Sequence, residues 1–230
     1  MTNDDARAQE LAQALREVRQ RIAVAGGADL LPITKFHPAA DIALLAGFGV
    51  GAVGENREKE AREKAAELQG RLDFHMVGQV QTNKANSVAR WAAAVHTVDS
   101  LRLVTSLQRG AELAIGRGDR EDPLPVLVQF SADGDPQRGG AVAADIDALA
   151  DAVAAAEHLE LRGLMTVPPI DADAAEVFRE GRKLVDKISD RVLGAPVYSA
   201  GMSQDLEIAI AEGSTLVRVG TDIMGPRPVI

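Results

Sequence analysis

Residues 123–167 read PLPVLVQFSADGDPQRGGAVAADIDALADAVAAAEHLELRGLMTV. The first nine residues are a short apolar run between a proline and a polar loop, which is typical of a buried strand. Residues 143–157 are rich in alanine and read as a helix, and the apolar segment 159–167 ends at a Pro-Pro pair. A strand, a helix and another strand in this order predict two parallel strands joined by a crossover helix.

The same alternation runs from one end of the chain to the other. Strands are predicted at residues 30–34, 51–56, 73–78, 94–100, 123–131, 159–167, 195–201 and 215–220. Helices are predicted over about 4–24, 38–49, 57–69, 82–93, 101–115, 143–157, 174–189 and 203–213. Eight strands, each but the last followed by a clear helix, favour a closed (β/α)8 barrel over an open doubly wound sheet. We therefore expect an α/β protein: a single-domain TIM barrel over residues 1–230 with an extra N-terminal helix.

The composition excludes several classes of protein. Hydrophobic residues make up 46% of the chain but aromatic residues only 3%, so the core must be aliphatic. A net charge of −9 argues against nucleic-acid and anionic-membrane partners, which require clustered positive charge. The absence of cysteine excludes disulfides, thiolate metal sites and a cysteine nucleophile. No apolar run approaches the roughly 18 residues of a membrane span, and the charged N-terminus has no signal-peptide core, so we expect a cytoplasmic protein.

Lys35 is the first candidate functional residue, because it stands where the strand 30–34 ends. Active sites of such barrels lie at the carboxyl ends of the strands. Burial lowers the pKa of a lysine, and a neutral amine can attack an aldehyde or ketone to give a Schiff base. The alternative is an ion pair, for example with Glu55 on the next strand. Of the other lysines, only Lys84 competes; Lys59, Lys64, Lys183 and Lys187 fit solvated helical patterns.

The last third of the chain contains a candidate phosphate site and a candidate buried arginine. Ser203 is placed as a helix N-cap, while Gly220 and Thr221 follow the last strand, and loops in these positions often bind phosphate in barrels. The alternative for Ser203 is simple helix capping. Arg218 alternates with Val217 and Val219, so it points into the barrel if the valines face helices. A buried arginine needs a carboxylate or a ligand acceptor.

An imine-forming lysine, a phosphate site and an arginine in one barrel mouth suggest pyridoxal 5′-phosphate (PLP). The aldehyde would join Lys35, the phosphate would lie at the loops of Ser203 and Gly220–Thr221, and the pyridine nitrogen would meet Arg218. Because arginine does not readily release its proton, the ring nitrogen would stay unprotonated, which weakens the cofactor as an electron sink.

Six segments then resemble, in order and spacing, the pyridoxal phosphate homeostasis protein family. They are LLPITKFHPAADI, GAVGENREKEA, DFHMVGQVQTNK, LRGLMTV, YSAGMSQDLEIAI and STLVRVGTDIMGPR, which span about residues 28–227. The resemblance implies a fold-type III PLP barrel similar to the N-terminal domain of alanine racemase, with a role in vitamin B6 homeostasis. It also implies cofactor contacts from Lys35, Asn56, Ser203, Arg218, Gly220 and Thr221.

The chain departs from the family pattern at two places. The family usually has Ser-Lys-Thr where this chain has Thr34-Lys35-Phe36. A lysine often found in the loop after the fifth strand is replaced by Arg138, and Gln129-Phe130-Ser131 stands for the common Gln-Val-Asn. The second departure puts any role of that loop lysine in doubt.

The sequence favours a carrier over an enzyme. Racemases of this fold have a second domain that supplies a catalytic tyrosine, and this chain ends ten residues after its last strand, with Tyr198 its only tyrosine. His37, His75, His96 and His158 suggest no acid–base role, and no HxH or carboxylate cluster has metal-binding spacing. We expect a non-catalytic, monomeric PLP carrier that delivers the cofactor to apo-enzymes. The alternatives are a minimal amino-acid racemase and a Schiff-base aldolase acting on a sugar phosphate.

Overall fold

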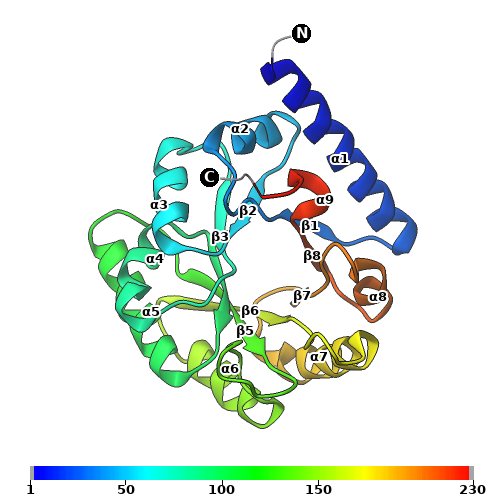
Figure 1. Ribbon diagram of the computed structural model, residues 1–230. Helices are drawn as coiled ribbons and strands as arrows, with labels where there is room; N and C mark the ends of the chain where they lie inside the picture. The colour runs from blue at the N-terminus through cyan, green and yellow to red at the C-terminus, as the bar shows by residue number, and fades with distance from the viewer. Residues whose placement is uncertain (1–2, 228–230) are drawn as a thin grey trace.

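The eight strands form one parallel sheet in a computed structural model of the chain, which describes residues 3–227 (Figure 1). The strand order is β1-β8-β7-β6-β5-β4-β3-β2, so the first strand pairs with the last. At the remaining seam, a bridge joins Ile33 to Gly54, and the Thr34 N–H donates to the Gly54 carbonyl at 3.1 Å. The sheet is a nearly closed barrel, and the predicted (β/α)8 class is confirmed.

Each predicted strand is present to within a few residues. The strands are β1 Asp29–Pro32, β2 Ala52–Glu55, β3 Asp73–Met76, β4 Ala94–Val98, β5 Leu124–Phe130, β6 Leu159–Thr166, β7 Val197–Ser199 and β8 Leu216–Val219. The α-helices are α1 Asn3–Ala25, α2 Ala39–Gly47, α3 Glu58–Glu67, α4 Ala85–Trp91, α5 Leu101–Gly116, α6 Ile146–Ala154, α7 Ala174–Ile188, α8 Leu206–Ala211 and α9 Thr221–Met224. Three short 3-10 helices span Thr82–Lys84, Ala143–Asp145 and Ser189–Arg191.

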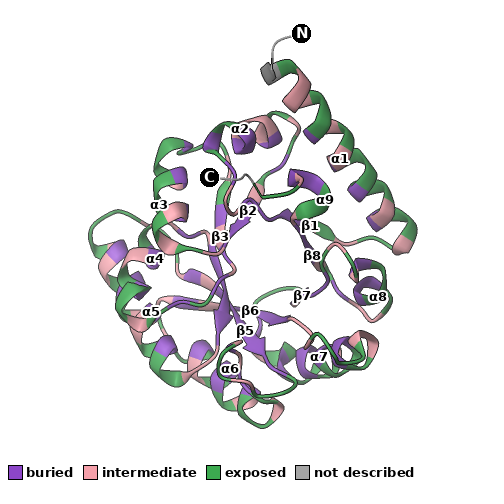
Figure 2. Cartoon of the chain, viewed as in Figure 1, coloured by how far each residue is buried: buried purple, intermediate pink, exposed green. Residues whose placement is uncertain are grey.

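The core is the layer between the strands and the ring of helices, where buried residues line the inner helix faces (Figure 2). Outward-facing strand residues alternate with inward-facing ones, as the pleat of a strand requires. Val217 and Val219 pack in this outer layer, fully buried. The predicted extra helix, α1, packs on the same layer through Leu11, Leu15 and Val18. Arg218, between the two valines, therefore faces the barrel interior, as the alternation predicted.

Near the carboxyl end, one helix prediction was inaccurate and one short helix was not predicted. The helix predicted from Ser203 begins only at Leu206, because residues 202–205 form a separate turn. In that turn the Met202 N–H donates to Asp205 Oδ1 at 2.6 Å and the Asp205 N–H donates back to the Met202 carbonyl at 3.2 Å. The short helix α9 after the last strand was not predicted. Among the described residues, no helix combines the length and apolarity needed to cross a membrane.

Candidate functional site

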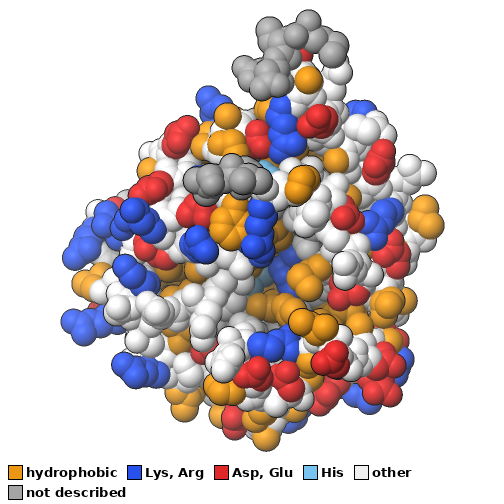
Figure 3. All heavy atoms as spheres, in the orientation of Figure 1, with side chains coloured by type: hydrophobic (Ala, Val, Ile, Leu, Met, Phe, Trp, Pro, Cys, Tyr) orange, Lys and Arg blue, Asp and Glu red, His pale blue; other side chains and the backbone are white. Residues whose placement is uncertain are grey.

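The strand order gathers most of the predicted site residues on one half of the barrel mouth. β1, β8 and β7 are consecutive in the sheet. Lys35 follows β1, Arg218 lies in β8, Gly220 and Thr221 follow β8, and Ser203 follows β7. Asn56 follows β2, across the β1–β2 seam. In the space-filling view of this end of the barrel, Lys and Arg side chains lie at a central hollow that hydrophobic and uncharged groups also border (Figure 3).

The Lys35 side chain is half-buried and makes no hydrogen bond or ion pair with another residue in the range 3–227. Burial lowers the pKa of its amine, the positive charge of Arg227 lowers it further, and Glu55 acts in the opposite direction. A lower pKa increases the neutral fraction of the amine at working pH, which is the nucleophilic form. The alternative expectation of a Lys35–Glu55 ion pair is wrong.

Glu55 instead pairs with Lys64, a residue that was expected to be solvated. Lys64 is only 8% exposed, and its Nζ donates to Glu55 Oε1 at 2.8 Å and to Glu60 Oε1 at 2.7 Å. A third hydrogen bond of 3.0 Å reaches the Thr34 carbonyl. The i, i+4 spacing of Glu60 and Lys64 predicts their ion pair, which is confirmed. The expected solvated position of Lys64 is wrong, because α3 turns this face toward the end of β2.

Arg218 is buried without an ion-pair partner among residues 3–227, although the charge of Asp205 acts on it from a greater distance. It is 5% exposed; Nη1 donates to Ser199 Oγ at 2.7 Å and Nη2 to the Thr166 carbonyl at 2.9 Å. No carboxylate of the described residues forms an ion pair with it, so that alternative is wrong. Burial lowers the pKa of the guanidinium to about 10. A buried cation held only by neutral groups is costly, and an acceptor on a ligand would offset that cost.

Arg218 is the end of a hydrogen-bonded chain that crosses the barrel interior, here called the polar relay: Arg218, Ser199, His96 and His75. Ser199 Oγ lies 3.2 Å from His96 Nδ1, and His96 Nε2 lies 3.1 Å from His75 Nδ1. Burial lowers the pKa of His75 to about 4 and the pKa of His96 well below its ordinary value, so both rings are neutral at pH 7.

One end of the relay has a defined direction. Arg218 can only donate, so Ser199 Oγ accepts from it. The direction of the two histidine contacts is set by the ring tautomers, and the chain is satisfied with either tautomer pair. Sequence patterns alone assign no role to His75 and His96. A signal was available, because both occupy inward-facing positions on adjacent strands.

The two loops of the predicted phosphate site are tied together by α1. Arg21 donates from Nη2 to the Ser203 carbonyl at 2.9 Å and from Nη1 to Asp222 Oδ2 at 2.6 Å. Ser203 is not an N-cap, since Asp205 holds the position before α8. Its hydroxyl has no partner among the described residues, and Thr221 is exposed at the first position of α9.

Gly220 offers open space to a ligand. A Cβ added there would have Ile33 Cβ, at 3.5 Å, and the Ile33 carbonyl oxygen, at 3.6 Å, as its nearest neighbours, which is ordinary contact. Protein packing therefore gives no reason for glycine at this position. A ligand group against the backbone would give one.

Asn56 lines a cavity of about 270 Å³ on the other half of the mouth, together with Gln129, Met165 and Arg138. Arg138 is not free in this cavity: Nη2 donates to the carbonyls of Val167 and Pro168, at 2.8 Å each. These bonds fix the loop after β5 to the end of β6. They give Arg138 a structural task that differs from that of a free amine.

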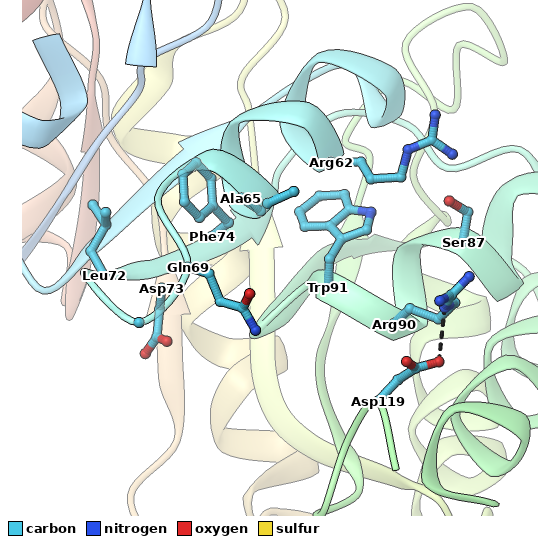
Figure 4. Close-up of a pocket in the computed structure, with 12 residues that line it drawn as sticks. Arg62, Ala65, Gln69, Leu72, Asp73, Phe74, Ser87, Arg90, Trp91 and Asp119 are labelled. Carbon is cyan, nitrogen blue, oxygen red and sulfur yellow. Dashed lines mark hydrogen bonds and ion pairs between the residues drawn. The ribbon is translucent and has the colours of Figure 1, made fainter. Parts of the chain in front are cut away.

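The donor set of the mouth fits PLP. An unpaired amine, a buried guanidinium without an ion-pair partner and two loops with free hydroxyls or an open backbone correspond to an aldehyde, a ring nitrogen and a phosphate. Another cavity, of about 460 Å³, lies outside the barrel between α3 and α4, around Trp91 (Figure 4). None of the predicted site residues lines it.

The comparisons with known proteins agree with this geometry. Residues 7–228 match the family described as alanine racemase, N-terminal domain. The pyridoxal phosphate homeostasis protein of Corynebacterium glutamicum is 52% identical over 205 residues, which cover 89% of this chain and 92% of that protein. The chain belongs to the pyridoxal phosphate homeostasis protein family.

Solved structures extend the likeness of this family member to three dimensions. PipY of Synechococcus elongatus, solved with PLP bound, has 31% identity and a TM-score of 0.81, covering 94% of this chain and all of PipY. Alanine racemase of Corynebacterium glutamicum has 18% identity and a TM-score of 0.71, covering 96% of this chain and 62% of the racemase. The second likeness shows a shared fold only.

Proposed function

We propose that this protein binds PLP covalently at the barrel mouth and serves in PLP homeostasis, holding and delivering the cofactor with little catalysis of its own. One observation carries the proposal. Lys35, whose amine is unpaired, follows β1, and Arg218, whose buried guanidinium has no ion-pair partner, lies in the adjacent strand β8. The name of its relatives and the PLP bound to PipY support the same function.

Each residue of the site has a distinct role in this proposal. Bound PLP supplies an aldehyde for covalent attachment and a ring that can withdraw electrons. Lys35 provides the attaching amine, and the loops of Ser203 and Gly220–Thr221 hold the phosphate. Arg218 donates a hydrogen bond to the ring nitrogen while keeping its own proton, because burial lowers its pKa only to about 10. Asn56 borders the cofactor from the β2 side.

The acid–base groups of the barrel favour holding over turnover. Tyr198 points away from the interior: its hydroxyl donates to the Phe178 carbonyl at 2.8 Å, and burial raises its pKa above the ordinary value. His75 and His96 are kept neutral and bonded to each other, so neither is poised to exchange a proton near pH 7. We infer a carrier whose recipients are apo-PLP enzymes and which acts as a monomer.

An absorption titration tests binding. PLP added to the purified protein should produce a saturable visible band with one equivalent bound, and the Lys35→Ala variant should lack it. The Lys84→Ala variant is the matched control, since Lys84 is an exposed lysine outside the predicted site. A band that persists in Lys35→Ala and vanishes in Lys84→Ala would refute the assignment of the lysine.

A turnover assay tests the carrier assignment. The PLP-loaded protein, incubated with L-alanine or L-serine, should form the D-isomer no faster than an equal concentration of free PLP. Racemisation well above that rate, lost in Lys35→Ala, would favour the racemase alternative. A colourless protein that borohydride traps only with a sugar phosphate would favour the aldolase alternative.

A further inference from the structure

The turn that contains Lys35 is held on both sides by acidic residues. The Thr34 hydroxyl donates to Glu55 Oε1 at 2.6 Å, and the Phe36 N–H donates to Glu60 Oε1 at 2.6 Å. Phe36 has φ 71°, the only positive φ of a non-glycine residue within 3–227. A bulky residue rarely adopts this conformation unless its surroundings impose it. The direction of Lys35 therefore depends on the contacts of its two neighbours.

Lys64 lies at the centre of these contacts. Its amine bonds both carboxylates and the Thr34 carbonyl, so the same cation neutralises the two groups that hold the turn. Glu55 is fully buried, and its Oε2 has no hydrogen-bond partner among the described residues. A buried carboxylate that lost its cation would take a proton or the nearest unpaired amine.

That unpaired amine is the one on Lys35. Lys35 directly follows Thr34 in the chain, and its amine ends a flexible four-carbon side chain. The charge of Glu55 already raises the pKa of this amine. Several charged or titratable side chains surround the Lys35 turn: Glu55, Arg57, Glu60, Lys64, Arg227 and His37. Among these, Lys64 is bonded to both glutamates.

We propose that Lys64 is a positioning residue whose task is to occupy Glu55, so that this carboxylate does not draw Lys35 into an ion pair and out of the barrel mouth. The use made of the free Lys35 amine rests on the proposed function. The charge state of Lys35, however, is a property of the protein without PLP and can be measured separately.

The experiment is a competitive-labelling titration of Lys35. Short pulses of acetic anhydride at a series of pH values, followed by peptide mass spectrometry, give the pKa of the Lys35 amine without PLP. The Lys64→Met variant should raise that pKa by about 1 unit or more, the size expected when an amine gains a nearby carboxylate. The Lys64→Arg variant keeps the charge and should leave the pKa at the wild-type value.

The double variant Glu55→Gln/Lys64→Met supplies the decisive control. It removes the carboxylate together with its partner, so the Lys35 pKa should return to about the wild-type value. If Lys64→Met is too unstable to purify, Lys64→Gln removes the charge but keeps a donor and must give the same rise. An unchanged Lys35 pKa in a folded Lys64 variant, or a rise that the double variant does not reverse, would overturn the proposal.

PLP binding is measured on the same variants, so the two proposals can fail separately. A labelling pattern as expected without any PLP adduct would reject the proposed function and retain the role of Lys64. A PLP adduct on Lys35, together with the same Lys35 pKa in the wild type and in Lys64→Met, would retain the proposed function and reject the role of Lys64.

Discussion

The buried position of Arg218 is unfavourable for the stability of the fold but favourable for binding a ligand. Its guanidinium is 5% exposed and bonded only to neutral oxygens. Replacing a buried charge of this kind by an apolar residue is often neutral or stabilising, whereas losing a hydrogen bond from a charged donor to a ligand costs about 1.5–3 kcal/mol.

Arg218→Met should therefore separate the two properties. The unfolding free energy of the PLP-free protein should stay the same or rise, while the dissociation constant for PLP increases about 10-fold to 100-fold. Urea unfolding and equilibrium dialysis measure the two quantities. A variant that loses stability while keeping its PLP affinity would show that Arg218 is a structural residue.

The histidines of the polar relay predict a pH dependence of stability. The pKa of His75 is lowered by burial from 6.5 to about 4. Above pH 6.5 the ring is neutral in both states, and between pH 6.5 and 4 only the unfolded state binds the proton, so stability is lost as the pH falls through this window. The shift corresponds to about 3 kcal/mol.

Urea unfolding between pH 7.5 and pH 4.5 checks this sign. The wild type should lose stability steadily below about pH 6.5, and His75→Gln should show a smaller loss over the same range. His158→Gln, outside the relay, should follow the wild type. Equal slopes in the wild type and His75→Gln would mean that His75 is protonated in the folded protein.

For single residues, the sequence predicts which way a side chain points better than it predicts the partner that the side chain bonds. The alternation along β8 was enough to predict that Arg218 points inward. The position of Lys35 at the end of a strand was enough to select it as a candidate functional residue. The partner of Glu55 could not be predicted, because spacing along α3 does not say which helix face meets the barrel. The relay was missed because its two halves lie far apart in the sequence, with the histidines on β3 and β4 and their partners Ser199 and Arg218 on β7 and β8.

At the scale of elements, the loops after β7 and β8 depend on a helix from the other end of the chain. Arg21 of α1 bonds Ser203, in the turn after β7, and Asp222, in the short helix α9 after β8. The extra helix was predicted, but this connection was not, because the strand–helix alternation does not say where a helix that precedes the first strand packs.

Two glycines in these loops allow a matched test of the phosphate position. Gly220→Ala should leave stability nearly unchanged, because the added Cβ meets only Ile33, at 3.5 Å. If the phosphate lies against this backbone, the affinity for PLP should fall at least several-fold, as the methyl group would occupy its place. Isothermal titration and thermal unfolding give both numbers. Unchanged affinity would place the phosphate elsewhere.

Gly201→Ala is the contrasting control. Gly201 has φ +92°, and a Cβ there would come within 2.6 Å of Ala209 Cβ. Both the backbone conformation and the contact oppose a side chain, so this variant should lose more than about 1 kcal/mol of stability.

Strands in this region were predicted to within a few residues, whereas the start of α8 was not, since a turn closed by Asp205 has the same composition as a helix start.

At the scale of the molecule, an acidic protein has cations at the centre of one face. The net charge is −9, yet Arg57 and Arg227 stack on the two sides of Phe36, with guanidinium carbons 4.8 and 4.7 Å from the ring centroid. Lys35, the residue before Phe36, lies beside this stack. The net charge argues against nucleic-acid and anionic-membrane partners, whereas a phosphorylated small molecule meets only the local charge.

Ligand linkage then predicts the response of the whole fold. PLP at 100 times its dissociation constant should stabilise the protein by about 2.7 kcal/mol, which corresponds to a rise of about 5–10 °C in Tm for a chain of this size. Scanning calorimetry with and without PLP measures the shift. Lys35→Ala should show a markedly smaller rise at the same PLP concentration, and an equal rise would indicate stabilisation from another site.

Borohydride reduction with peptide mapping shows most directly whether Lys35 is the amine that holds PLP. The protein is mixed with one equivalent of PLP, reduced, digested and analysed by mass spectrometry. We expect a single pyridoxyl adduct, on Lys35, with Lys64 unmodified because its amine is bonded to Glu55, Glu60 and the Thr34 carbonyl. Adducts spread over Lys84 and the helix lysines, with Lys35 unmodified, would contradict this expectation.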